Sequence, residues 1–281
     1  MLDQLLKEQY ENNDNYKVVD ISNNKRCIIF CSSHGLWDYN EETFKSNIVK
    51  GDRYEWENLA NNKHLQIFGR RIFIRDIHLH FYVEGINKKV CNIDKIIETL
   101  KPLCKGYEVT LVGYSAGGYL AILLGCVLGA KRVFSFGGQV VLPQWSGAKG
   151  VLSFSDFEYL YRHKDEPLYN KWFDLCELIK SSDCKIYQVY AKFNQPDKVQ
   201  AGFIKDCKNV HLFAMPSEKH GTNVWGIVYP YLFTADDKQL ISYSVSHKNG
   251  IKNNLFFALK FCGVFTTFNY LFRKILKRIK R

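Results

Sequence analysis

Several common signatures are missing from this sequence. No two cysteines are spaced as C-x-x-C, and no Cys/His cluster has the spacing of a zinc site, so neither a dithiol redox centre nor a bound metal is predicted. The sequence contains no Walker loop and no G-x-G-x-x-G turn, so no nucleotide-binding loop is predicted. Internal repeats and low-complexity linkers are also absent, which argues against a repeat architecture.

The first part of the sequence carries no secretory pattern. Residues 1–15 are acidic and polar, with neither a basic segment nor an apolar core. The nine cysteines are odd in number, and several of them, such as Cys27 and Cys126, lie in apolar runs. This placement is typical of small buried side chains in a reducing compartment, so we expect a cytoplasmic protein.

Positive charge is concentrated near the C-terminus. The formal net charge is +11. Six cations stand among the last nine residues, namely Arg273, Lys274, Lys277, Arg278, Lys280 and Arg281. The charge therefore needs an explanation specific to residues 246–281.

Residues 246–281 join an aromatic-rich apolar stretch to this basic segment. Ile275, Leu276 and Ile279 form one helical face, while Lys260, Asn269 and two threonines interrupt the apolar part, so a membrane-spanning helix is not expected. We expect an amphipathic anchor on an anionic membrane surface, at the inner face of the cytoplasmic membrane. A solvated helix packed on the domain is the first alternative. Nucleic-acid binding is the second, and no nucleic-acid partner is expected.

Apolar runs alternate with helical periodicity over residues 1–245. Strands are predicted at 16–21, 26–31, 107–112, 131–138, 186–192 and 210–216, with further strand signals between 65 and 85. Helices are predicted at 2–11, 92–106 and 117–128. Residues 143–182 are helical and aromatic in pattern, like an inserted cap. Strands alternating with helices predict one α/β domain with a mostly parallel sheet flanked by helices.

Gly113-Tyr114-Ser115-Ala116-Gly117 matches G-x-S-x-G between a predicted strand and a predicted helix. In this setting the turn is tight enough to strain the serine backbone, and larger residues in place of the glycines would collide with the neighbouring strand and helix. The start of the helix then directs N–H groups at developing negative charge. The motif predicts the α/β-hydrolase fold, with Ser115 as the nucleophile of an acyl-transfer reaction; a chance match in a turn is the alternative.

A nucleophilic serine needs a base and an acid that orients the base. In this fold the acid and then the histidine follow the serine along the chain, each after a strand. Asp197 follows the strand predicted at 186–192, and His220 follows the strand predicted at 210–216. We predict His220 as the base and Asp197 as the acid. Asp206 and Glu218 lie nearby, so Asp197 could instead be a solvated carboxylate.

The oxyanion formed during acyl transfer needs two backbone donors. The first is expected to be the N–H of Ala116, which follows the nucleophile. The second is expected in the loop after the strand at 26–31, at Gly35 or Leu36, although the HGGG form of this loop is absent. His34 and Tyr114 are candidate substrate-binding residues, and for His34 simple packing is an equal alternative.

The segments "FCSSHGLWDY", "RDIHLHFYVEG", "GYSAGGYLA", "SFGG" and "QPDKVQ…EKHG" together resemble the α/β-hydrolase-fold O-acetyltransferases of bacterial capsule and lipooligosaccharide synthesis, including the sialate O-acetyltransferases. The resemblance covers about residues 16–225. It implies transfer of acetyl from acetyl-CoA, as co-substrate, to a sugar hydroxyl of a surface glycan, with sialic acid as one candidate acceptor and with Ser115, Asp197 and His220 as the triad.

Two other functions remain open from the residues alone. A carboxylesterase or glycan O-deacetylase would use the same triad, because transfer and hydrolysis share the first half-reaction. A non-catalytic peripheral membrane protein on a hydrolase scaffold is the third hypothesis, and the intact motif with a well-placed His and Asp argues against it.

Overall fold

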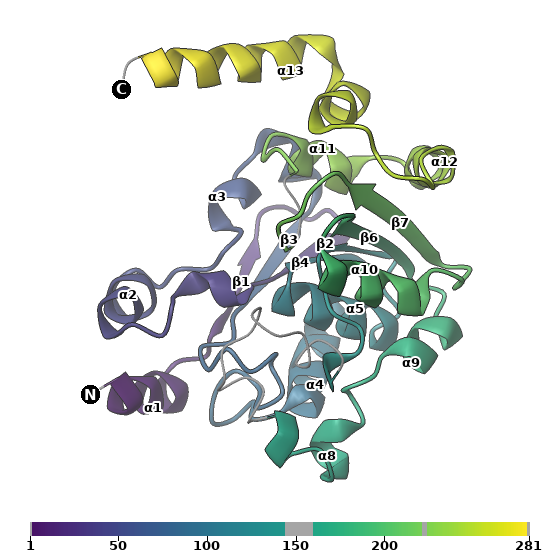
Figure 1. The fold of residues 1–281 in the computed structure, drawn as a ribbon. Helices are drawn as coiled ribbons and strands as arrows, with labels where there is room; N and C mark the ends of the chain where they lie inside the picture. Colours follow the sequence, from purple (N-terminus) through teal and green to yellow (C-terminus); the bar gives the residue numbers. More distant parts are fainter. Residues whose placement is uncertain (1, 144–159, 221–223, 280–281) are drawn as a thin grey trace.

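The computed structural model describes residues 2–143, 160–220 and 224–279, without the side chains of residues 278 and 279. A seven-stranded sheet in the order β1-β3-β2-β4-β5-β6-β7 runs through the molecule, with helices on both faces (Figure 1). The strands are β1 (Tyr16–Asp20), β2 (Arg26–Cys31), β3 (Arg70–Ile74), β4 (Glu108–Tyr114), β5 (Arg132–Phe136), β6 (Lys185–Ala191) and β7 (Val210–Met215). β1 pairs antiparallel with β3, and all other neighbours pair parallel. The predicted fold class, with a mostly parallel sheet, is confirmed.

Helices connect most of these strands. Those before β4 are α1 (Leu2–Asn12), η1 (His34–Leu36), α2 (Glu41–Phe44), η2 (Lys45–Lys50), α3 (Glu57–Ala60), η3 (Lys63–Ile67) and α4 (Ile93–Cys104). Those after β4 are α5 (Ala116–Val127), α8 (Pro167–Asn170), α9 (Cys176–Ser181), α10 (Gln195–Ile204), α11 (Val228–Thr234), α12 (Asp237–Ser246) and α13 (Asn254–Ile279).

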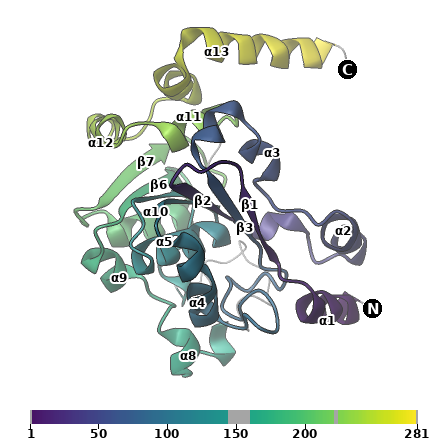
Figure 2. The same cartoon turned by 180° about the vertical axis from the view of Figure 1, so that it is seen from behind.

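Two apolar layers cover the two faces of the sheet, which Figures 1 and 2 show from opposite sides. Cys27, Ile29 and Cys31 of β2 point into the layer formed by α4, α5 and α9. Ile28 and Phe30 point into the layer formed by α11, α12 and the beginning of α13. A strand that is buried on both faces has no polar side to show, which explains its continuous apolar sequence.

The strand signals between residues 65 and 85 are realised only in part. Residues Lys63–Ile67 form the short helix η3, and β3 ends at Ile74. After β3 the buried carboxylate of Asp76 accepts hydrogen bonds from the backbone N–H groups of His78, Leu79, His80 and Tyr82, at 2.7–3.1 Å. These bonds satisfy the backbone in a coiled loop, so the alternating apolar residues do not continue the strand.

The predicted cap and the predicted domain boundary concern two other segments. Of the cap-like insertion predicted at 143–182, residues 144–159 lie outside the described residues; beyond them, Phe173, Leu175 and Ile179 belong to the layer beside α5. The boundary predicted at residue 245 falls inside α12. Ile251, Phe257, Ala258 and Cys262 are all buried, so the packed part of the chain continues well beyond that point.

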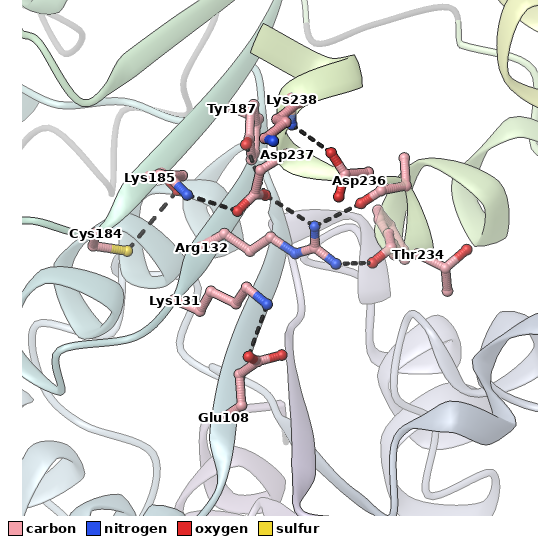
Figure 3. Close-up of polar contacts among 12 residues, drawn as sticks. Glu108, Lys131, Arg132, Cys184, Lys185, Tyr187, Thr234, Asp236, Asp237 and Lys238 are labelled. Carbon is pink, nitrogen blue, oxygen red and sulfur yellow. Dashed lines mark hydrogen bonds and ion pairs between the residues drawn. The ribbon is translucent and has the colours of Figure 1, made fainter.

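A polar cluster fastens α12 to the amino ends of the strands (Figure 3). Asp237, near the start of α12, accepts hydrogen bonds from Arg132 at 3.0 Å, Lys185 at 2.7 Å and the Tyr187 hydroxyl at 2.8 Å. Arg132 also donates to the carbonyl oxygens of Phe233 and Ala235, both at 2.8 Å. The Asp237 carboxylate of α12 contacts side chains from β5 and β6, and the Arg132 guanidinium of β5 contacts the backbone at the end of α11. The cluster therefore holds the C-terminal helices against β5 and β6.

Candidate active site

Ser115 lies at a sharp turn between β4 and α5. Its backbone has φ 51° and ψ −120°, and its N–H donates to the Phe136 carbonyl at 2.9 Å. A Cβ on Gly113 would come within 2.0 Å of the Gly117 carbonyl oxygen, and one on Gly117 within 2.3 Å of the Cys31 carbonyl oxygen. The two glycines of the motif are therefore required by close backbone approach, and the strained serine is held between them.

The turn is located where the order of the strands reverses. From β2 the chain passes to β3 on one side of it and then to β4 on the other side. The loops that follow β2 and β4 must therefore diverge, and the crevice between them at the carboxyl ends of the strands is the usual ligand site of such sheets. Ser115 follows β4 directly, and residues 32–36 follow β2.

The structure brings Ser115, His220 and Asp197 into one hydrogen-bonded chain. His220 Nε2 lies 2.8 Å from Ser115 Oγ, and His220 Nδ1 lies 2.6 Å from Asp197 Oδ1. The Asp197 side chain is fully buried, whereas the His220 side chain is 23% exposed. A proton on Nδ1 is then held by the carboxylate, which leaves Nε2 free to accept the serine proton.

Asp197 lies in helix α10, although no helix was predicted after the strand at 186–192. Asn194 caps this helix by accepting the Asp197 N–H at 3.1 Å, which places the carboxylate in the first turn, where the helix dipole favours negative charge. Asp197 Oδ2 also accepts the Ala191 N–H at 3.2 Å. The two alternative carboxylates, Asp206 and Glu218, are exposed. Asp197 is thus the carboxylate that the fold buries against His220.

The loop after β2 lies against the start of α5. Ala116 is the first residue of α5, so its N–H belongs to the helix end and lacks an intrahelical acceptor. The Gly35 N–H donates to Ser33 Oγ at 3.0 Å, so it already has an acceptor within its own loop. Ala116, Gly35 and Leu36 therefore stay predicted oxyanion donors, and Gly35 would have to exchange its bond to Ser33 for one to the ligand.

His34 is packed within the same loop. Its ring meets the Phe81 ring edge to face, with centroids 4.8 Å apart, and burial lowers its pKa to about 4. The imidazole is therefore neutral at physiological pH. Its Nε2 is buried and has no hydrogen-bond partner among the described residues. Packing against Phe81 accounts for the position of the ring. The unpaired Nε2 is available for a polar contact with a ligand.

Tyr114 has a role in the fold that the sequence did not indicate. Its hydroxyl donates to the His220 carbonyl at 3.0 Å, which steadies the loop that carries His220. Its side chain also lines a cavity of about 330 Å³, together with Glu55, Trp56, Asn58, Leu59, Gly226 and Tyr229. Tyr114 links this cavity to the triad, because its hydroxyl bonds the His220 carbonyl and its backbone directly precedes Ser115.

Glu55 is a site residue that the sequence analysis missed. Its carboxylate accepts the Ser33 N–H at 2.6 Å and the Ser33 hydroxyl at 3.0 Å, and burial raises its pKa. Next to it, Trp56 Nε1 donates to the Cys31 carbonyl at 3.2 Å. These hydrogen bonds hold the end of β2 and the loop that follows it in place. No local motif marks them, since they lie in an irregular segment between η2 and α3.

The described residues contain no group of three or more His, Cys, Asp or Glu side chains that could hold a metal ion. All nine cysteines fall within the described residues and are free thiols. What the site offers is therefore a serine hydroxyl, a histidine ring, a buried carboxylate and backbone N–H groups.

The sheet order, the glycine-flanked turn and the position of Ser115 define the α/β-hydrolase fold. The chain matches no family model and no curated protein sequence. Among solved structures it is similar to the capsule O-acetyltransferase of Neisseria meningitidis serogroup A, with 15% identity and a TM-score of 0.50 over 72% of this chain and 84% of that one.

Two further solved structures match with lower TM-scores. A mutant of the same capsule O-acetyltransferase in complex with CoA has 14% identity and a TM-score of 0.48, over 76% of this chain and 91% of that one. Esterase B from Lactobacillus rhamnosis has 14% identity and a TM-score of 0.42, over 75% of this chain and 80% of that one. At these identities the likeness concerns the fold alone.

Proposed function

We propose that this chain is a serine-nucleophile acyltransferase that moves an acetyl group from acetyl-CoA to a hydroxyl of a bacterial surface glycan. The observation that carries acyl transfer is the continuous contact from Ser115 Oγ through the His220 ring to the buried Asp197 carboxylate. The acetyl donor and the glycan acceptor rest on the sequence resemblance, which also points to sialic acid as one acceptor. The fold shared with a capsule O-acetyltransferase is compatible with that choice.

The first half-reaction forms an acetyl-serine. Ser115 Oγ attacks the thioester carbonyl carbon while His220 Nε2 takes the hydroxyl proton. The negative charge that develops on the carbonyl oxygen is stabilised by the Ala116 N–H at the start of α5. The C–S bond then breaks, and the CoA sulfur leaves with the proton that His220 returns. Asp197 stabilises the imidazolium that exists between these two proton transfers.

The second half-reaction repeats these steps with an alcohol. The acceptor hydroxyl gives its proton to His220 Nε2 and attacks the acetyl carbon, and Ser115 Oγ then leaves and regains the proton. The cavity beside Tyr114 is the natural position for the acceptor, because Tyr114 connects it to His220 and because it combines aromatic walls from Trp56 and Tyr229 with the Glu55 carboxylate.

Water competes with the glycan for the acetyl-serine. The same triad hydrolyses the intermediate if a water molecule reaches the acetyl carbon, so transfer requires an acceptor that is held in place and excludes water. This competition makes hydrolysis the direct alternative outcome of any assay.

The proposal is tested by incubating the purified full chain with acetyl-CoA and a panel of glycans that includes sialylated acceptors. CoA thiol release is followed with and without each glycan, and the products are weighed by mass spectrometry. We expect release to accelerate with the correct glycan, which gains one acetyl group. Equal release without glycan, with acetate as the sole product, would establish the esterase instead. The Ser115→Ala variant controls for spontaneous thioester cleavage.

A further inference from the structure

Helix α13 is bent at Gly263. This residue has φ 77° and ψ 169°, a backbone conformation that is open to glycine and costly for other residues. The helical segments before and after it therefore point in different directions. Figure 1 shows the second segment running along one end of the molecule, beyond α11.

The segment before the bend is part of the folded domain. Phe257 and Ala258 are fully buried, and Cys262 is nearly so, in the layer that also contains Phe213 and Tyr243. The segment after the bend touches the domain with one side. Thr267 is fully buried, and the Tyr270 ring lies 5.7 Å from the Trp225 ring.

The opposite side of the second segment carries exposed apolar residues. Phe265 is 83% exposed and Phe272 is 60% exposed, the largest values among the described phenylalanines of this segment. At about 100° per residue, six exposed apolar residues fall within an arc of roughly 120°. They are Val264, Phe265, Phe268, Phe272, Ile275 and Leu276, and we call this arc the outer face of α13.

The exposed cations of this segment lie outside the outer face. At about 100° per residue, Arg273 is roughly 60° beyond one edge of the face, and Lys274 and Lys277 are roughly 80–100° beyond its edges. Arg273, Lys274 and Lys277 are exposed on the same segment, and no Asp or Glu follows Asp237 in the sequence. A second copy of the chain docked on this face would bring like charges together, which is unfavourable. An anionic lipid surface supplies both an apolar layer for the aromatic side chains and counter-charges for the cations.

The geometry favours a helix that lies on a bilayer over one that crosses it. By length and composition alone, residues Asn254–Lys277 could cross a membrane, with a mean hydropathy of 1.5 in their most apolar window. However, the first part of this stretch is buried in the domain. At about 1.5 Å per residue, residues 264–279 make a helix of about 24 Å, shorter than the roughly 30 Å hydrocarbon core.

We propose that the outer face of α13 docks the protein on an anionic bilayer, with the aromatic side chains at the headgroup boundary. This proposal goes beyond the proposed function and does not depend on it. It does give that function a location, because Trp225, which contacts Tyr270 of α13, directly precedes Gly226, and Gly226 and Tyr229 line the cavity that Tyr114 also lines. A docked molecule would therefore hold this cavity on the side of the domain that carries α13 and faces the membrane.

The test is flotation of the full chain with vesicles of phosphatidylethanolamine and phosphatidylglycerol, and with vesicles of phosphatidylcholine alone. We expect binding to the anionic vesicles, weakened but not abolished by high salt, because salt screens only the charges. Replacing Phe265, Phe268 and Phe272 together by Ser should lower binding about tenfold or more. The matched control is Phe256→Ser, which removes a phenylalanine that is 56% exposed but lies before the bend.

Three further measurements, of ester hydrolysis, thermal unfolding and tryptophan emission, distinguish the possible outcomes. Hydrolysis of a soluble ester by each variant, with its thermal unfolding, shows that the fold and the triad are intact, so failure of the proposed function is seen separately from failure of docking. A Phe268→Trp variant should show a blue-shifted emission on anionic vesicles that Phe256→Trp lacks. The proposal is overturned if the parent chain does not float, if the triple variant floats like the parent, or if the parent dimerises through this face in solution. Extraction-resistant insertion would also overturn it, because it would indicate a spanning helix.

Discussion

His220 is the residue on which the proposed chemistry depends most, because its two ring nitrogens have different partners. Nδ1 faces a carboxylate with no exposure to solvent, and Nε2 faces the serine hydroxyl. A carboxylate at Nδ1 selects the tautomer in which Nε2 can accept a proton. Asp197 therefore determines which ring nitrogen of His220 carries the proton, in addition to stabilising the charged ring.

Replacing Asp197 by Asn should disable the site without unfolding the protein. An amide that donates to Nδ1 selects the opposite tautomer, so Nε2 would carry a proton and could not accept the one on Ser115. We expect kcat for acetyl-CoA cleavage to fall by roughly three to four orders of magnitude. Stopped or continuous thiol-release assays measure this. Asp206→Asn, at an exposed position of the same region, is the matched control and should retain parental activity; an equal loss in both variants would contradict the assignment.

Replacing Glu55 by Gln should loosen the loop that follows β2. A neutral amide still accepts the Ser33 N–H, but it cannot form charge-assisted bonds to both the N–H and the hydroxyl. We expect kcat/KM to fall about tenfold with little change in the melting temperature.

A pH profile separates positioning by Glu55 from simple packing. Burial raises the pKa of Glu55, so on acidification this carboxylate takes up its proton earlier than an exposed one would. The loss of activity on the acidic side should therefore begin at a higher pH in the parent than in Glu55→Gln. Superimposable acidic limbs would show that the ionised carboxylate does not matter.

At the scale of the elements, the cluster around Asp237 makes a prediction about stability. Burial alone would raise the pKa of Asp237, but hydrogen bonds from Lys185 and Tyr187 and the charge of Arg132 hold it below its usual value. A carboxyl whose pKa is depressed by folding stabilises the protein above its unfolded pKa of about 3.9, and that contribution is lost as the pH falls through the lower, folded pKa.

The Asp237→Asn variant should lower the free energy of unfolding near neutral pH by about 2–3 kcal/mol, because Arg132 would keep its two carbonyl acceptors but lose its carboxylate. Urea denaturation at several pH values measures this. The difference from the parent should shrink below about pH 4. Asp183→Asn removes a fully exposed carboxylate and should leave the free energy of unfolding unchanged within error. A constant difference at all pH values would contradict the account.

The elements that could be predicted from sequence are those whose apolar pattern is long and unambiguous. β2, β4 and α5 are buried on all sides, and their sequences are correspondingly apolar. The end of β3 could not be predicted, because its termination depends on four backbone contacts made by Asp76. Helix α10 was also missed: its start depends on the Asn194 cap and leaves a polar surface that resembles a loop.

At the scale of the whole molecule, the three predicted triad residues come together because the loops after β4, β6 and β7 all open at the carboxyl edge of one sheet. That convergence follows from the topology, so the order of the residues along the chain was sufficient to predict it. Glu55 and the cavity beside Tyr114 were not predictable, since they depend on how an irregular segment folds back over the loop after β2.

The C-terminal region shows the opposite case. The sequence pattern predicts a single tail over residues 246–281, but the bend at Gly263 divides α13 into a buried part and an exposed part. The hydrophobic pattern is similar in both, so it cannot tell which aromatic rings face the domain. Deleting the whole region would remove Phe257 and Ala258 from the core, which is why point substitutions on the outer face are the appropriate test.

The central claim is that Ser115 carries the acetyl group between donor and acceptor. The most direct measurement is intact-protein and peptide mass spectrometry of the full chain after brief incubation with acetyl-CoA in the absence of glycan. The account predicts one added acetyl group on the peptide containing Ser115, its disappearance when an accepting glycan is added, and no acetylation of that peptide in Ser115→Ala. Release of CoA by the Ser115→Ala variant at the parental rate, or acetyl transfer without a labelled Ser115, would contradict it.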